Sequence, residues 1–94
     1  MSHAFPRLAK WQIVTAVVIG HMPYGLRARV PSGEIGVVDR VLISDLPIGL
    51  SEWPVLGDQL TLVSGGYTSG GQLRLSARTS DLELARTRSR HKPG

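Results

Sequence analysis

The sequence predicts a small all-β domain in which five short strands form a closed or partly open barrel. Several segments alternate apolar and polar residues at a period of two, as strands with one buried face do. Glycine-rich turns separate these segments, and one long apolar connection joins the third segment to the fourth. With 94 residues, 41% of them hydrophobic, the chain can bury one core but not two.

The first three strands are expected close together in the chain. Residues 11–19 carry β-branched and apolar side chains on both faces, which predicts a strand buried on both sides. Residues 20–23 are expected to turn the chain into a hairpin. Its first strand alternates apolar residues with two arginines over residues 26–30, so the arginines point to solvent. A turn at residues 31–33 leads to the third strand at residues 35–38.

Two glycines, Gly25 and Gly36, interrupt the strands of this hairpin. A glycine inside a strand marks a bulge or the close approach of another backbone or of a ligand. Both interpretations stay open at this point: either a strongly coiled sheet needs glycine in order to bend, or the missing side chains admit a ligand.

The second half of the barrel is predicted after an irregular connection. Residues 40–54 contain prolines and a glycine that break strand and helix patterns, and their apolar side chains are expected to pack over one end of the barrel. The fourth strand is predicted over residues 59–63 and the fifth over residues 72–77, with a flexible glycine-rich loop at residues 64–71. The outward side chains of the fifth strand are expected to be Gln72, Arg74 and Ser76.

A short helix is expected after the barrel. Ser80 and Glu83 have the spacing of a capping box, which predicts a helix over residues 81–88. So short a helix is stable only if Leu82 and Leu84 dock on the barrel. The expected organisation is a loose arm at residues 1–10, a barrel domain at residues 11–79, and a short helix with a basic disordered tail at residues 80–94.

The excess positive charge lies at the C-terminal end. The formal net charge is +4, but five basic and five acidic residues cancel up to Leu73. The remainder of the chain carries six basic residues against two acidic ones. A basic end of this kind is either a solvated tail or a source of nonspecific attraction for nucleic acid.

Several function classes find no support in the sequence. The chain has no cysteine, which excludes disulfides, thiolate chemistry and cysteine zinc sites. Its three histidines lie far apart, its acidic residues are scattered, and no phosphate-binding lysine follows the glycine-rich loop. We therefore expect no metal, no cofactor and no catalysis. Without a leader segment or an apolar run of membrane length, the protein is expected to be soluble and cytoplasmic.

Four short motifs occur in the order and at the spacing of a known RNA-binding repeat. They are Tyr24-Gly25 before an alternating strand, Gly36-Val37-Val38 in the third strand, Val55-Leu56-Gly57-Asp58 opening the fourth, and Leu73-Arg74-Leu75-Ser76-Ala77-Arg78 closing the fifth. Over residues 11–78 the chain resembles the RNA-binding repeat of the bacterial small-ribosomal-subunit protein S-one, which also occurs in polynucleotide phosphorylase and some endoribonucleases. The resemblance implies a five-stranded OB-fold barrel.

The resemblance also implies a binding face, which this chain retains in part. The family's first exposed aromatic falls on Tyr24 and its second on Arg27, which can stack on a base or hold a phosphate. The family's histidine falls on Asp39, whose carboxylate would repel phosphate, and its arginine falls on Gln72. The implied RNA-binding residues are Tyr24, Arg27, Arg29, Asp39, Gln72, Arg74 and Arg78.

Two functions are compatible with this partly eroded face. The resemblance implies a non-catalytic protein that binds single-stranded RNA by stacking and arginine contacts, with single-stranded DNA open as a second ligand. The alternative is a protein–protein interaction module on the same barrel, with little affinity for nucleic acid, which docks on a larger protein or ribonucleoprotein assembly. The neutral charge of the barrel favours the alternative, and the fold alone does not choose between them.

Overall fold

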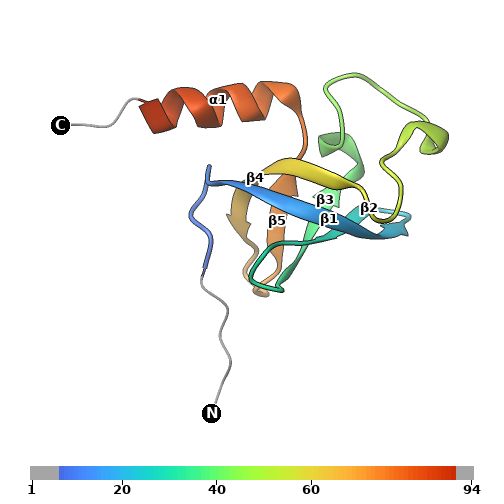
Figure 1. The fold of residues 1–94 in the computed structure, drawn as a ribbon, viewed down its shortest axis with the longest axis horizontal. Coiled ribbons are helices and arrows are strands. Elements are labelled where there is room, and N and C mark those ends of the chain that lie inside the picture. Colours follow the sequence, from blue (N-terminus) through green and yellow to red (C-terminus); the bar gives the residue numbers. More distant parts are fainter. Residues whose placement is uncertain (1–6, 91–94) are drawn as a thin grey trace, which may run out of the picture.

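In the computed structural model, which describes residues 7–90, five strands close into a barrel and one helix follows (Figure 1). The elements are β1 (Ile13–Met22), β2 (Gly25–Arg29), β3 (Ile35–Asp39), β4 (Gln59–Tyr67), β5 (Leu73–Ser76) and α1 (Thr79–Arg90). Around the barrel the order is β1-β2-β3-β5-β4, and β4 closes the barrel against β1. Only the β3–β5 pair among these is parallel. The predicted all-β barrel with a C-terminal helix is confirmed.

The inward side chains alternate along the strands as predicted. Leu26 and Ala28 from β2 and Leu73 and Leu75 from β5 are at most 1% exposed. Full burial of a leucine side chain contributes roughly 1.5 to 3 kcal/mol, so the three leucines stabilise the centre of the barrel most. The residues between these inward positions lie on the outer face of the barrel.

Both hairpin glycines are required by the packing of the protein itself. A Cβ on Gly36 would lie 2.6 Å from Leu75 Cδ1, so a side chain there would displace a core leucine. Gly25 has a φ of +147°, and a Cβ there would lie 2.0 Å from the carbonyl oxygen of Val38. The interpretation that the coiled sheet needs these glycines is confirmed, since protein atoms fill the space that a side chain would take.

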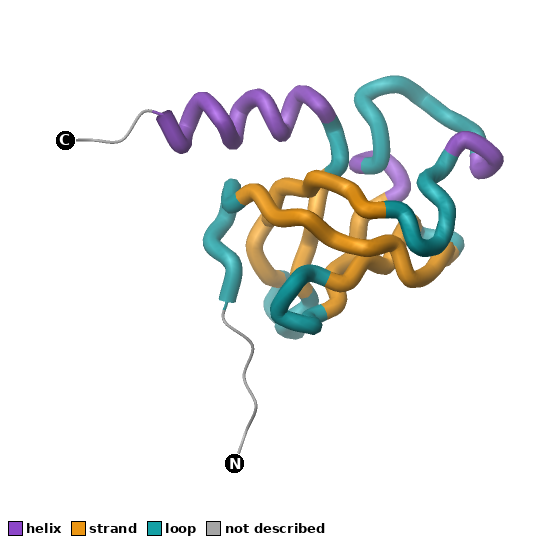
Figure 2. Tube along the Cα trace, viewed as in Figure 1, coloured by secondary structure: helices purple, strands orange, loops and turns teal. Residues whose placement is uncertain are grey.

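Two segments predicted as turn and loop belong to strands (Figure 2). Residues 20–22 continue β1, and residues 64–67 continue β4. Strand pairing is irregular at both extensions, between Val18 and Gly20 in β1 and between Ser64 and Tyr67 in β4. A bulge inserts a residue and bends the strand without ending it, so glycines that suggest a loop instead mark a coiled strand.

The connection between β3 and β4 covers one end of the barrel only in part. It contains two short 3-10 turns, η1 (Arg40–Leu42) and η2 (Leu50–Glu52). Ile43 and Trp53 are 6% and 8% exposed, and His21 Nε2 lies 2.6 Å from the carbonyl oxygen of Pro54. The expected packing is thus confirmed for Ile43 and Trp53 but wrong for Leu46 and Leu50, which are exposed. Three further large apolar side chains in and after the connection are exposed as well: Val41, Val55 and Leu56.

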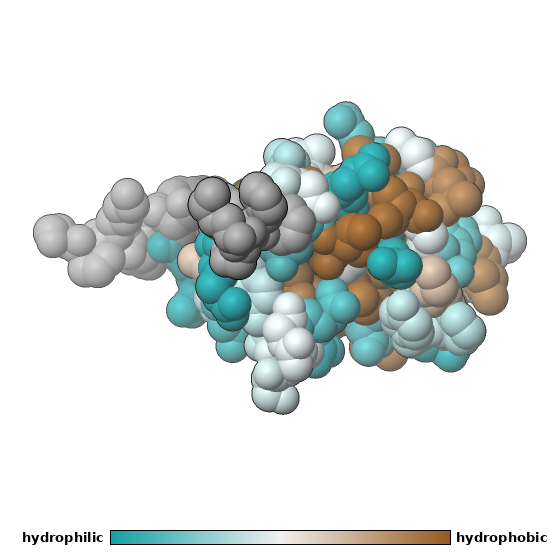
Figure 3. Space-filling view, turned by 90° about the horizontal axis from the view of Figure 1, so that it is seen from below, coloured by the Kyte–Doolittle hydropathy of each residue, from teal (hydrophilic) through white to brown (hydrophobic). Residues whose placement is uncertain are grey.

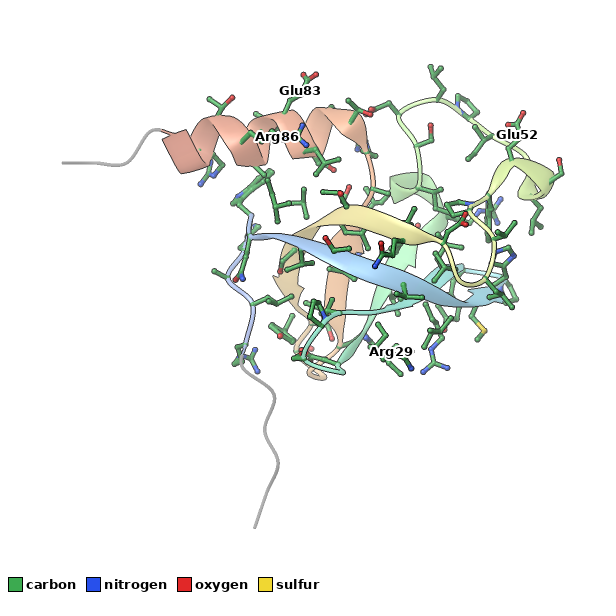
Figure 4. All side chains as sticks on the ribbon, viewed as in Figure 1. Arg29, Glu52, Glu83 and Arg86 are labelled. Atoms are coloured by element: carbon green, nitrogen blue, oxygen red, sulfur yellow. The ribbon has the colours of Figure 1, made fainter. Side chains whose placement is uncertain are left out.

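The helix α1 begins at Thr79, earlier than predicted, and it is not started by a capping box. Asp45 from the connection holds its first turn instead: its carboxylate accepts hydrogen bonds from the Ser80 N–H, at 3.1 Å, and from the Ser80 hydroxyl. The Ser80 hydroxyl therefore donates to Asp45, a residue far away in the sequence, instead of capping its own helix. Glu83 points away from the barrel (Figure 4).

The contact of α1 with the barrel also differs from the prediction. Ala85 is 1% exposed and makes the contact, whereas Leu84 is 50% exposed and Leu82 is half-buried. The helix also continues through residues 89 and 90, beyond its predicted end, where a disordered tail was expected, and residues 91–94 lie outside the described part of the chain. None of the helices in residues 7–90 is long and apolar enough to cross a membrane.

Candidate nucleic-acid interface

Outward side chains of β2, β3 and β5 form one row across the barrel. Strand pairing places Arg27 opposite Val37, and Val37 opposite Arg74. We call Arg27, Val37 and Arg74 the arginine row. Neighbouring strands lie about 4.8 Å apart, so the two arginine backbones are separated by roughly 10 Å. The row therefore presents two cations on either side of an apolar residue.

Glycines flank the arginine row on both sides. Gly20 of β1 pairs with Arg27, and a Cβ on Gly20 would lie 3.8 Å from Arg27 Cβ. A Cβ on Gly65 of β4 would lie 3.6 Å from Arg74 Cβ. At Gly65 the missing side chain leaves the surface low beside Arg74, whereas the Met22 side chain covers Gly20, with its Cε 3.2 Å from the position of a Cβ there. Gly20 and Gly65 are absent from the residues predicted from sequence, since only strand pairing brings them beside the arginines.

A second row lies next to the first and contains Arg29 and Gln72. Arg29 is exposed and pairs with Ile35 of β3. The Gln72 side-chain amide donates hydrogen bonds to the carbonyl oxygens of Ile35, at 3.1 Å, and Leu73, at 3.2 Å. Gln72 thus joins β3 to β5 where their parallel pairing begins, while Arg29 remains open to solvent.

Tyr24 and Asp39 lie at the other end of this face. Tyr24 is in the turn before β2, is 48% exposed, and its carbonyl oxygen accepts a hydrogen bond from the Arg40 N–H at 2.8 Å. Asp39 ends β3, and its carboxylate accepts a hydrogen bond from the Val41 N–H at 3.1 Å, which caps η1. The aromatic ring is therefore available at the surface, whereas the carboxylate already has a structural role.

Arg78 lies away from this face, between the connection and α1. Its Nε donates to Asp45 Oδ1 at 3.1 Å, so its charge is neutralised locally. Hydrogen bonds from the Ser80 hydroxyl and N–H, with a smaller contribution from Arg78, hold the pKa of Asp45 below its ordinary value of 3.8. Ser76, predicted to point outward from β5, is 7% exposed and donates to Asp81 at 2.6 Å, because the start of α1 covers it.

The surface between the cations is apolar. Val17, Ile35 and Val37 are outward residues of β1 and β3 that are half-buried. Figure 3 shows hydrophobic surface running across the barrel between hydrophilic areas, seen from below, the side to which Arg29 projects in Figure 4. Apolar surface beside arginines suits the stacking and backbone contacts that single-stranded nucleic acid makes with OB folds. Within residues 7–90 no cluster of three or more His, Cys, Asp or Glu could hold a metal ion.

The chain is similar to known proteins in its structure but not detectably in its sequence. No family model matches the chain, and no curated protein matches it. The chain is similar to a chain of the a/eIF2alpha–aDim2p–rRNA complex from Pyrococcus horikoshii OT3, with a TM-score of 0.72 and 15% identity over 88% of this chain and 53% of that one. The barrel has the OB fold.

Two further structures show the same likeness. GSP13 from Bacillus subtilis has a TM-score of 0.67 and 16% identity, over 94% of this chain and 62% of that one. The uncharacterized protein MJ1198 from Methanocaldococcus jannaschii has a TM-score of 0.60 and 11% identity, over 73% of this chain and 90% of that one. This chain spans about half of the first structure and less than two thirds of GSP13. The fold is one that nucleic-acid-binding domains use.

Proposed function

We propose that this protein is a non-catalytic RNA-binding protein that holds single-stranded RNA across the outer face of β2, β3 and β5. The arginine row is the observation that carries this proposal. In the described part of the chain, neither Arg27 nor Arg74 forms an ion pair, whereas Arg78 does. Two uncompensated guanidinium groups flanking an apolar residue are suited to phosphates on either side of a base.

The contacts proposed for each residue follow from its place on the face. Tyr24 stacks on a base because its ring is exposed at the edge of the face. Arg27, Arg29 and Arg74 hold phosphates or stack on bases, and the apolar residues between them support the bases. Asp39 repels phosphate at its end of β3, so the RNA backbone is expected to cross the face on the side of Arg29. The likeness to a chain from a complex that contains rRNA supports the same proposal.

The experiment that tests the proposal maps the bound surface. Isotope-labelled protein is titrated at low salt with a single-stranded RNA of eight nucleotides, and backbone amide shifts are followed by NMR. We expect the shifts to centre on residues 24–29, 35–39 and 72–74. The variant with both Arg27→Gln and Arg74→Gln serves as the control and should show much weaker shifts. Shifts confined to residues after Arg86, or no shifts, would contradict the proposal.

A protein partner is the second candidate, and one observation favours it. Five large apolar side chains of the β3–β4 connection and its end are 59% to 73% exposed, which is unusual for residues of this size. If the protein only docks on another protein, RNA retention at moderate salt depends on the basic end and disappears when residues after Arg86 are removed. Retention by the shortened chain would instead support the RNA proposal.

A further inference from the structure

A cavity of about 280 Å³ lies between α1 and the outer surface of β4 and β5. Figure 1 shows α1 running above these strands, close to the start of β1. The residues that line it include the apolar residues Trp11, Leu42 and Val63 and the charged residues Lys10 and Arg74. The volume is near the lower end of the range for small-molecule sites, so it suits one aromatic ring system rather than a larger ligand.

The backbone at Trp11 is held in a rare conformation that positions the indole beside this cavity. Its φ is +74°, in the left-handed region that bulky residues seldom adopt. The Trp11 N–H donates to the Ser64 carbonyl oxygen at 2.7 Å, and the Ser64 N–H donates to the Gln12 carbonyl oxygen at 2.8 Å. The Arg88 guanidinium carbon lies 4.9 Å from the centre of the indole. Hydrogen bonds and a cation–π contact therefore fix the ring between β4 and α1.

Gly65 leaves an open path between the arginine row and the cavity. Its φ is not in the left-handed region, so its backbone does not require glycine. A Cβ at this position would meet the Arg74 carbonyl oxygen at 3.5 Å and Arg74 Cβ at 3.6 Å, which are ordinary contact distances. Packing and backbone geometry would therefore accept a side chain here, and its absence keeps the cavity open next to Arg74.

We infer that this cavity, the Trp11 pocket, takes one base of the single-stranded RNA whose phosphates lie on the arginine row. Arg74 belongs to the row and also lines the pocket, so a strand that passes over Gly65 reaches the pocket within one strand spacing of about 4.8 Å. The indole and apolar walls suit a planar base, and Lys10 and Arg74 suit its phosphate. The Asp81 carboxylate, which also lines the pocket, can accept a hydrogen bond from a base amino group. This inference rests on the proposed function.

The test fills the pocket without changing the arginines. Gly65→Val places a strand-favouring side chain at the opening of the Trp11 pocket. Gly70→Val is the matched control, because that glycine also lacks a left-handed φ and a Cβ there would meet only Thr68 Oγ1, at 3.8 Å. Each protein is titrated with an adenylate RNA of eight nucleotides. We expect Gly65→Val to weaken binding by at least about 5-fold, as loss of one stacked base does, and Gly70→Val to bind like the unmodified protein.

A second measurement uses the unmodified protein and so does not depend on the folding of a variant. The indole N–H signals of Trp11 and Trp53 are followed by NMR during the same titration, and only that of Trp11 is expected to shift. One result would overturn the inference about the Trp11 pocket and leave the proposed function standing. In that result the Trp11 indole signal does not shift and Gly65→Val binds with full affinity, while the amides of the arginine row still shift. Absence of RNA binding at the arginine row would overturn both.

Discussion

Arginines occupy two regions of this molecule with opposite electrostatic surroundings. In the arginine row, Arg27 and Arg74 are flanked by glycines and by an apolar valine. In the contact between the connection and α1, the charge of Arg78 is paired with Asp45, which also holds Ser80. The first arrangement leaves cations for a ligand, and the second uses a cation to fasten a helix. The number of arginines in a sequence therefore does not show which of them can bind phosphate.

The two tyrosines show the same contrast. Tyr24 is exposed at the edge of the proposed face. The Tyr67 hydroxyl donates to Glu34 at 2.9 Å and accepts from the Leu8 N–H at 3.1 Å, while the Arg7 guanidinium carbon lies 4.0 Å from its ring centre. Tyr67 thus has protein partners on its hydroxyl and ring, and Tyr24 has a free ring surface for a base.

The largest expected effect comes from the backbone that supports the face. Gly25→Ala should lower the free energy of unfolding by roughly 3 kcal/mol or more, because the new Cβ would overlap the Val38 carbonyl oxygen at a positive φ. Chemical denaturation measures this loss. Gly49→Ala is the control, since a Cβ there meets no atom within 4 Å, and it should change stability by less than about 0.5 kcal/mol. Equal stability of the two variants would contradict the strand geometry.

Substitutions of the two tyrosines test whether the exposed ring of Tyr24, and not Tyr67, contributes to RNA binding. Tyr24→Ala should weaken RNA binding by about 1 to 3 kcal/mol, the usual contribution of one stacked base, when affinity is measured by fluorescence anisotropy. Tyr24→Phe should retain the affinity because the ring remains. Tyr67→Phe should also bind normally, since its hydroxyl bonds to Glu34 within the protein. An affinity unchanged in Tyr24→Ala would place the stacking site elsewhere.

The salt dependence of binding separates the free arginines from the paired one. Three phosphate contacts, by Arg27, Arg29 and Arg74, predict a slope of about −2 in a plot of log affinity against log salt. Replacing Arg27 and Arg74 by glutamine should reduce the magnitude of that slope by about 1.4, because each phosphate contact on a single strand contributes about 0.7. Arg78→Gln should leave the slope unchanged. A loss of slope in Arg78→Gln equal to that of the double variant would remove the distinction between the two regions.

The smallest expected effect concerns the pH dependence of stability at Asp45. The folded protein holds the pKa of this carboxyl below 3.8, so its stabilisation is present above about pH 4 and is lost as the pH falls through the lowered pKa. Asp45→Asn should therefore be less stable than the unmodified protein near neutral pH, and the difference should shrink on acidification below that range. Thermal unfolding at several pH values measures this difference. If the difference in stability between the two proteins does not change with pH, the charge of Asp45 does not cause it.

Local alternation made much of the fold predictable. The period of two along β2 and β5 identified Leu26, Leu73 and Leu75 as inward residues and Arg27 and Arg74 as outward ones, because neighbouring side chains of a strand point to opposite faces. The order of short motifs also identified the OB barrel. Glycines were less informative, because a glycine can either end a strand or bend it, and Gly20 and Gly66 lie at irregularities inside strands that continue past them.

The sequence by itself thus determined the strands, their faces and the type of barrel, since these depend on neighbouring residues. Only the tertiary structure decided that Arg27 and Arg74 share one row, because β3 pairs with β5 across a long separation in the chain. It also decided that Asp45 neutralises Arg78, that α1 covers Ser76, and that Trp11 borders a cavity. Each of these depends on contacts between distant segments, and a pattern read along the chain contains no distances between them.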